Sequence, residues 1–121
     1  MPDFSRIEYR DSYVPLCREL DISPPGGYAL GDQFWADGVH VVHPGMPRIP
    51  EGAVWLPGIF DWLELLEVAG HSAIVFEDTI TPAGGVGWLV YPLGNRDDFG
   101  SGITREAALA RIWAKTQGNA G

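Results

Sequence analysis

The chain contains one cysteine, one lysine and no long hydrophobic run. Cys17 has no second cysteine to pair with, and such sparse use of cysteine is typical of a reducing compartment. No apolar run approaches the roughly 18 residues that a membrane-spanning helix needs. The first residues, Met-Pro-Asp-Phe-Ser-Arg, lack the basic and apolar segments of a secretory signal. We therefore expect a cytoplasmic protein that does not associate with a membrane.

Positive charge is also scarce. Lys and Arg together number 8 against 16 Asp and Glu, for a net charge of −8. The negative charge is greatest in residues 51–100, which hold eight acids and one basic residue, Arg96, whereas residues 1–50 hold seven acids and four basic residues. This segment would repel a phosphate backbone, which disfavours direct binding of nucleic acid. A partner protein with a basic surface is electrostatically compatible, and solubility alone also explains an acidic surface.

The sequence lacks the motifs that would assign an enzymatic function. Gly84-Gly85-Val86-Gly87 has no Gly-Lys-Ser/Thr ending, and it leads into a predicted strand instead of the helix of a phosphate-binding loop. Ser101 lies in Gly-Ser-Gly rather than in the Gly-x-Ser-x-Gly of a hydrolase. Cys17 lies on the apolar face of a predicted helix, which favours a buried structural thiol over a nucleophile. We therefore assign no catalytic residue, metal or cofactor, and the sequence favours a non-enzymatic role.

Two of the three histidines lie three positions apart, in His40-Val41-Val42-His43. Residues three apart on a regular strand point to opposite faces, so we do not expect these two rings to share a metal. A cross-strand ion pair between Asp32 and His43 is the stronger expectation. The alternative function is that of a small metal-binding protein or enzyme, which requires His43, Asp32 and His71 to converge in a pocket.

Apolar residues spaced three and four positions apart predict three helices, over residues 12–20, 59–69 and 105–116. Pro15 is tolerated in the first helix because the first turn has spare N–H groups. The second helix ends at Gly70, and Phe60 is expected to widen its buried apolar stripe. Thr104 is expected to cap the third helix.

Alternating apolar residues and turn signals predict five strands, over residues 28–36, 39–43, 53–56, 72–78 and 85–91. Asp37-Gly38 predicts a two-residue turn, which would pair Trp35 with His40 and Asp32 with His43. Residues 93–102 are expected to form a loop. The predicted fold is α+β, a single two-layer domain over residues 1–121. It would hold a mainly antiparallel sheet of four to five strands and three helices, in the order α-β-β-β-α-β-β-α.

An acidic stripe on the second helix is the best candidate for a partner-binding surface. Its carboxylates recur every three residues and therefore lie on one side of the helix, although a merely solvated helix face explains them too. Two further acids follow in the next predicted strand, and a tryptophan beside the Asp-Gly turn would suit a cationic partner. The candidate partner-binding residues are Asp61, Glu64, Glu67, Glu77, Asp78 and Trp35.

Two stretches, "AVWLPGIFDWLELLEVAG" over residues 53–70 and "GITREAALARIWAKTQG" over residues 102–118, resemble a loose group of small uncharacterised phage, prophage and bacterial proteins. Members of this group pair a "WLP…LLE" helix with a terminal "T-EEAL-RLW" helix that ends in glycine. The segment "YVPLCREL", residues 13–20, fits the opening helix of the same group. No activity is attached to the group, so the resemblance implies no functional residues.

These observations favour a small acidic accessory protein of phage or mobile-element origin that acts through protein–protein contact. A sharper form of this hypothesis is an inhibitor of a host nucleic-acid-binding or defence protein. Such an inhibitor would mimic phosphate, and its five carboxylates would share one exposed face. The remaining alternative is a homo-oligomeric structural component, for which a homodimer with a contiguous apolar interface is expected.

Overall fold

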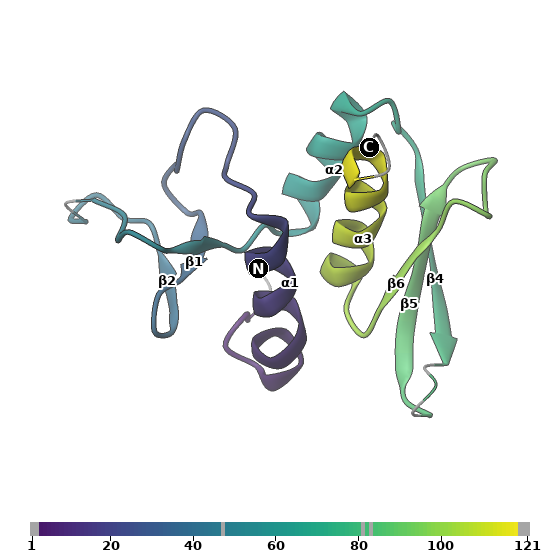
Figure 1. Ribbon diagram of the computed structural model, residues 1–121, viewed down its shortest axis with the longest axis horizontal. Coiled ribbons are helices and arrows are strands. Elements are labelled where there is room, and N and C mark those ends of the chain that lie inside the picture. Colours follow the sequence, from purple (N-terminus) through teal and green to yellow (C-terminus); the bar gives the residue numbers. More distant parts are fainter. Residues whose placement is uncertain (1–2, 47, 81, 83, 119–121) are drawn as a thin grey trace. The chain divides into compact units, whose positions relative to one another are not determined.

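The computed structural model describes residues 3–46, 48–80, 82 and 84–118. The chain divides into two compact units, residues 1–57 and residues 58–121, which are described separately below (Figure 1). Each unit contains a three-stranded antiparallel sheet and helical segments, so the predicted α+β class is confirmed. The predicted single sheet of four to five strands is wrong, because the strands divide between two sheets. That the units fold as one domain stays a prediction.

The first unit opens with a helix that contains a π-helical segment, η1 (Tyr9–Tyr13), followed by α1 (Val14–Leu20). The backbone N–H of Val14 donates to the carbonyl of Tyr9, five residues back. Pro15 explains this wider turn, because in a regular α-helix its ring would clash with the carbonyl four residues earlier. The helix therefore begins before the predicted residue 12, and Pro15 lies within it rather than in its first turn.

The sheet of the first unit consists of β1 (Gln33–Trp35), β2 (Val39–Val41) and β3 (Val54–Trp55), in the order β2-β1-β3. Trp35 pairs with Val39 and Phe34 pairs with His40, one residue away from the predicted register. The connecting loop is therefore three residues long, and it holds Asp37 at φ 56° and Gly38 at φ 134°. A shift of one residue exchanges the two faces of a strand, so His40 lies on the side of Phe34 instead of the side of Trp35.

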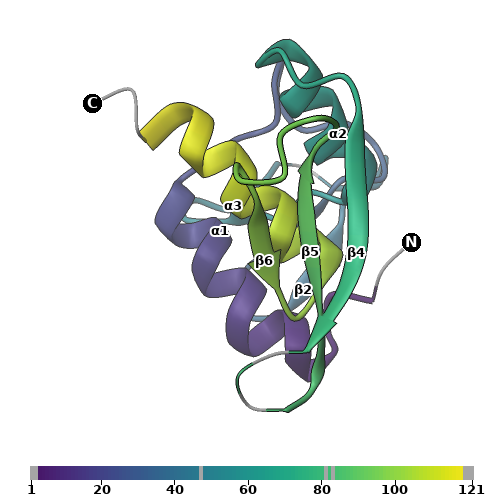
Figure 2. The same ribbon diagram turned by 90° about the vertical axis from the view of Figure 1, so that its right-hand side faces the viewer.

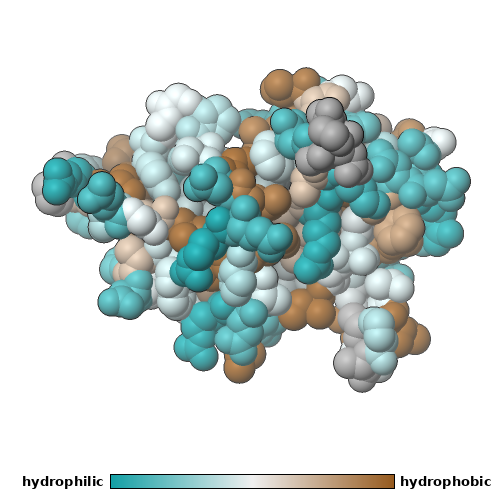
Figure 3. Space-filling model, viewed as in Figure 1, coloured by the Kyte–Doolittle hydropathy of each residue, from teal (hydrophilic) through white to brown (hydrophobic). Residues whose placement is uncertain are grey.

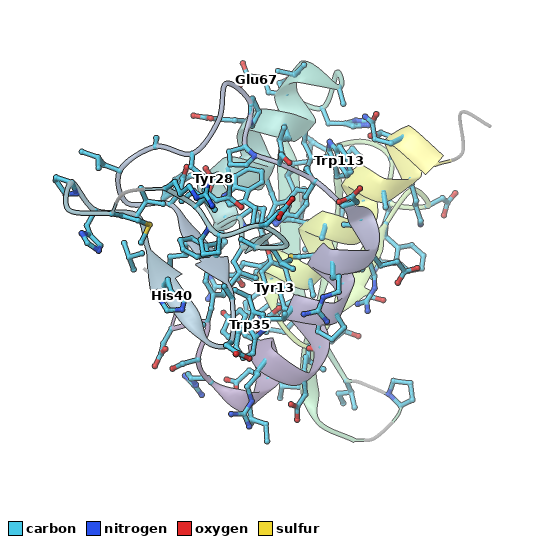
Figure 4. All side chains as sticks on the ribbon, turned by 60° about the vertical axis from the view of Figure 1, so that its left-hand side comes forward. Tyr13, Tyr28, Trp35, His40, Glu67 and Trp113 are labelled. Atoms are coloured by element: carbon cyan, nitrogen blue, oxygen red, sulfur yellow. The ribbon has the colours of Figure 1, made fainter. Side chains whose placement is uncertain are left out.

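Aromatic side chains form the core of the first unit. The ring of Tyr13 stacks on that of Phe4, with 5.4 Å between the centroids, and its hydroxyl donates to the carbonyl of Pro57 at 2.5 Å. Phe34, from the sheet, is also buried. The labelled Tyr13 side chain in Figure 4 points from the helix into the body of this unit. Because Tyr13 bonds to Pro57, it fixes the end of the segment that follows β3.

The second unit is built on a long hairpin. β4 (Ile74–Ile80) pairs with β5 (Val86–Pro92) over seven consecutive residue pairs, and β5 also pairs with β6 (Gly100–Gly102). The sheet order is β4-β5-β6. The hairpin was predicted to within two residues at each end, whereas β6 lies in a stretch predicted to be a loop.

The helix α3 (Arg105–Gly118) covers one face of this sheet (Figure 2). It approaches so closely that a Cβ atom at Gly100 would lie 2.3 Å from the carbonyl oxygen of Ala108. The helix α2 (Ile59–Val68) packs against α3, with the rings of Trp62 and Trp113 5.8 Å apart. No helix of this unit covers the opposite face of the sheet among the described residues.

No helix in the described part of the chain is both long enough and apolar enough to span a bilayer.

Candidate partner-binding surface

Helix α2 begins and ends as its sequence predicts. Gly58 precedes the first turn, and its backbone N–H donates to the Asp61 carboxylate at 2.9 Å. A carboxylate in the first turn also stabilises the positive end of the helix dipole. The helix ends at Val68, and Gly70 takes φ 102°, the left-handed conformation typical of a helix stop. Asp61 therefore acts as a structural cap, which occupies one oxygen of this predicted partner-binding residue.

One side of α2 is buried and fixes the orientation of the helix. Trp62 and Leu66 are fully buried, and Trp62 packs against Trp113 of α3. Helix α2 cannot rotate about its axis without breaking these contacts, so its opposite side faces solvent.

The exposed side of α2, formed by Phe60, Glu64, Glu67 and Val68, combines apolar and acidic side chains; we call it the α2 outer face. Phe60 is 82% exposed and Val68 is 89% exposed, the two highest exposed fractions among the large apolar residues that the structure describes. Glu64 and Glu67 lie between them along the helix and are exposed. Neither forms an ion pair with another described residue.

The figures show the C-terminal part of this surface from two directions. Hydrophobic atoms stand out over the C-terminal end of α2, at the top of Figure 3. In Figure 4 the labelled Glu67 points away from the helix into solvent, whereas Trp113 points into the unit. The α2 outer face is therefore free to contact another molecule.

The prediction that Phe60 widens the buried stripe is wrong. At about 100° per residue, Phe60 lies roughly 160° around the helix from Trp62, and it is exposed. The sequence analysis did not predict that Phe60 and Val68 are exposed, although a helical wheel places both residues well away from the buried Trp62.

The two acids of β4 do not extend the acidic surface as one patch. Glu77 pairs with Leu89 and Asp78 pairs with Trp88, and successive residues on a strand point to opposite faces. Asp78 is on the face that α3 covers further along the sheet, whereas Glu77 is on the open face. The five carboxylates proposed for phosphate mimicry therefore do not share one face.

Glu77 forms its contacts with other residues of the second unit. It accepts a hydrogen bond from the hydroxyl of Tyr91 and forms an ion pair with Arg96 at 3.3 Å. The hydroxyl of Tyr91, and then Arg96, lower the pKa of the Glu77 carboxyl, and the same bond raises the pKa of Tyr91. This carboxylate therefore anchors Arg96, which lies in the loop after β5, to the open face of the sheet.

Trp35, the remaining candidate, belongs to the first unit. It lies in β1 between Val39 of β2 and Val54 of β3, and it is half-buried. Its neighbour Phe34 faces the other side, where its ring stacks on His40 at 5.3 Å. A ring nitrogen of His40 also lies 2.9 Å from the carbonyl of Ala36. Phe34 and His40 are thus structural partners within the hairpin, whereas Trp35 lies on the opposite side of β1.

The residues of the metal or enzyme alternative are engaged separately. The Asp32 carboxylate accepts from the backbone N–H of Ala29 at 2.8 Å, and Nδ1 of His43 accepts from that of Gly45 at 3.2 Å. The backbone N–H of Val42 donates to the carbonyl of Asp32, so Asp32 does not lie opposite His43 as predicted. The predicted Asp32–His43 ion pair does not form. Across residues 3–46, 48–80, 82 and 84–118, no three His, Cys, Asp or Glu side chains are placed to hold a metal ion. His71 lies in the second unit.

Cys17 is buried on α1, as its place on the apolar face predicts. Burial raises the pKa of its thiol to about 12. Because the thiolate is the reactive form of cysteine, this thiol remains protonated and inert at neutral pH.

Comparisons of the chain with models of protein families, with curated proteins and with solved structures gave no match.

Proposed function

We propose that this chain is a small acidic, non-enzymatic accessory protein that acts by binding another protein through the α2 outer face. The observation that carries the proposal is the exposure of Phe60 and Val68 on either side of Glu64 and Glu67. The two apolar residues are eight positions apart, so they lie roughly 12 Å apart along the helix. A complementary partner has two apolar contact points with a basic patch between them.

The apolar and the acidic residues of the α2 outer face are expected to play different roles in binding. Burial of Phe60 and Val68 would remove apolar surface from water and supply most of the affinity. The two carboxylates would steer a basic partner toward the surface and exclude acidic ones. Binding is therefore expected to weaken as salt increases, because exposed charges are screened over about 10 Å at 0.1 M salt.

Inhibition of a host nucleic-acid-binding or defence protein, by a protein of phage or mobile-element origin, is the sharper form of the proposal. Its support is the acidic character of the α2 outer face. It now relies on Glu64 and Glu67, because Asp61 caps the helix and Glu77 is bound to Arg96. Competition between this protein and nucleic acid for the captured partner tests it directly.

The test is affinity capture from a bacterial lysate with two double variants, Phe60→Ser/Val68→Ser and Glu64→Lys/Glu67→Lys. We expect both to lose the partner that the unchanged protein retains, because each removes one component of the surface. Glu19→Lys/Glu51→Lys is the matched control, since it makes the same change in charge at exposed acids of the first unit. Capture of the same partner at undiminished levels by both α2 variants would contradict the proposal.

A further inference from the structure

The outer edge of β4 is a second surface with a defined geometry. β4 is seven residues long and lies at one end of the order β4-β5-β6, so one of its edges has no neighbouring strand among the described residues. A strand at the edge of a sheet presents unpaired N–H and C=O groups, which can template the addition of another strand.

The alternation of hydrogen-bonded and non-hydrogen-bonded residue pairs between β4 and β5 shows which backbone groups of β4 face outward. The N–H of Leu93 donates to the carbonyl of Ala73 at 2.9 Å, so residues 73 and 93 form a hydrogen-bonded pair. Such pairs alternate along an antiparallel ladder, and therefore residues 75, 77 and 79 bond to β5. Pro92, which has no N–H, accordingly lies in a pair that does not exchange these bonds. The outward groups belong to Ile74, Phe76, Asp78 and Ile80.

Most devices that protect sheet edges are absent from β4. Edge strands are commonly blunted by proline, charged side chains (lysine above all), a β-bulge or a covering element, and of these β4 carries the charges of Glu77 and Asp78. β4 contains neither proline nor lysine, and its seven pairs with β5 run without a bulge. The side chains at the end of the hairpin are apolar, with Ile80 78% exposed and its partner Val86 73% exposed. The free edge is therefore regular and partly hydrophobic.

Asp78 sets the charge of this edge. Its carboxylate is exposed and forms no ion pair with a described residue, unlike Glu77, which Arg96 neutralises. Phe76, Asp78 and Ile80 lie on the same face of the strand. A strand added along this edge would place its own alternate residues beside these three side chains.

We propose that the free edge of β4 binds an extended segment of a partner protein as a fourth strand. The segment has the pattern apolar-x-Lys/Arg-x-apolar, with its basic side chain opposite Asp78 and its apolar side chains beside Phe76 and Ile80. The pattern reads the same in both directions, so it fits parallel and antiparallel addition. Main-chain hydrogen bonds supply affinity in this mode of recognition, and alternate side chains supply specificity.

A second copy of the chain is a poorer occupant of the same edge. Antiparallel self-pairing centred on Asp78 places two copies of this carboxylate directly opposite each other, and pairing centred on Glu77 places Asp78 opposite Phe76, which offers it no opposite charge. Like charges directly opposite on neighbouring strands are destabilising. Pairing centred on Phe76 places Asp78 opposite an isoleucine, which gives the charge no partner. Charge complementarity therefore favours a basic segment of a different protein.

The test uses the full chain and a blocked peptide, Thr-Val-Thr-Arg-Thr-Val-Thr. Binding is expected to slow hydrogen exchange at the backbone amides of Phe76, Asp78 and Ile80, which face outward. The amides of Val75, Glu77 and Thr79 already bond to β5, so their exchange should change less. A peptide with Glu in place of Arg is the matched control, and it should bind about tenfold more weakly or not at all.

A charge exchange separates this site from a nonspecific acidic surface. Asp78→Lys should lose the Arg peptide and gain the Glu peptide, whereas Asp97→Lys, the same change at an exposed loop residue, should alter neither. Arg-peptide binding that protects none of the outward amides would overturn the proposal. So would sedimentation as a dimer, without peptide, that protects those amides. Glu64→Lys/Glu67→Lys should leave peptide binding intact, so this proposal and that for α2 can fail separately.

Discussion

The two three-stranded sheets of this chain are stabilised by different means. In the first unit the strands are two or three residues long, and the buried aromatic side chains Phe4, Tyr13 and Phe34 supply the core. In the second unit two strands of seven residues carry the sheet, and Gly100 admits the backbone of α3 at close range. The first unit therefore depends on the volume of its aromatic side chains, whereas the second, besides buried side chains such as Trp62 and Leu66, also requires that position 100 carry no side chain.

Removal of Phe34 is expected to have the largest effect on stability. Phe34 is 1% exposed, and Phe34→Ala leaves a cavity in the small core of the first unit. Such truncations cost about 3–5 kcal/mol. Chemical denaturation gives the free energy of unfolding, and labelling of the buried Cys17 thiol reports opening of this unit in particular.

The control for this variant is Val41→Ala, at an exposed position on the neighbouring strand. It should change stability by no more than about 0.5 kcal/mol. A loss below 1 kcal/mol for Phe34→Ala, by the same measurements, would mean that the first unit does not depend on its aromatic core.

The second unit is tested by adding one methyl group. In Gly100→Ala the new Cβ would lie 2.3 Å from the carbonyl oxygen of Ala108 and 2.9 Å from the backbone nitrogen of Ile112. Backbone atoms cannot rotate away as a side chain can, so we expect a loss of about 1–3 kcal/mol, at the upper end of that range. Ser101→Ala, at the adjacent exposed position, is the control and should be nearly neutral.

Gly100→Ala also tests whether the two units unfold together. If residues 1–121 form the predicted single cooperative domain, Gly100→Ala will accelerate Cys17 labelling as much as it lowers global stability. Unchanged labelling of Cys17, together with faster amide exchange in β4 and β5, would show instead that the units unfold independently.

The sequence predicted those elements whose signals are local. The helix at Ile59–Val68 and the cap at Thr104 follow from apolar spacing and capping chemistry, which act within a few residues. β6 was missed because Gly-Ser-Gly has low strand propensity. Its strand conformation follows from the close approach of α3, which only the tertiary structure specifies.

The candidate site could be predicted only where its residues follow a local pattern. The helical period places Glu64 and Glu67 on one side of α2, and both are exposed. The hairpin register depended on whether the Asp-Gly turn contains two residues or three, and a single-residue error reversed the faces of His40. Capture of Glu77 by Arg96 joins residues 19 positions apart, a pairing that no local pattern encodes.

A smaller effect is expected at the N-terminus of α3. The Thr104 hydroxyl accepts from the backbone N–H of Ala107 at 3.1 Å, as expected of a capping residue. Thr104→Ala should therefore cost the second unit about 1 kcal/mol, measured by denaturation. Thr104→Ser retains the hydroxyl and should recover most of this loss. Equal losses for both variants would assign the effect to packing of the threonine methyl group rather than to the cap.

The smallest effect is expected at Glu77, on the open face of the second unit. Its pKa is lowered in the folded protein, so its stabilising contribution is present above the ordinary pKa of a glutamate. That contribution is lost as the pH falls through the lowered folded-state value. Because the group is exposed, the change in stability is small, and its pKa is the better measurement. Carbonyl NMR titration should find Glu77 below its ordinary value.

Two variants apportion this shift between its causes. Tyr91→Phe removes the hydrogen bond that lowers the Glu77 pKa most, and it should raise that pKa toward the ordinary value. Arg96→Gln removes the second cause and should raise it less, because solvent screens an exposed ion pair. A larger rise in Arg96→Gln than in Tyr91→Phe would reverse this order. The loop after β5 would then be held to the sheet mainly by charge, and salt would release it.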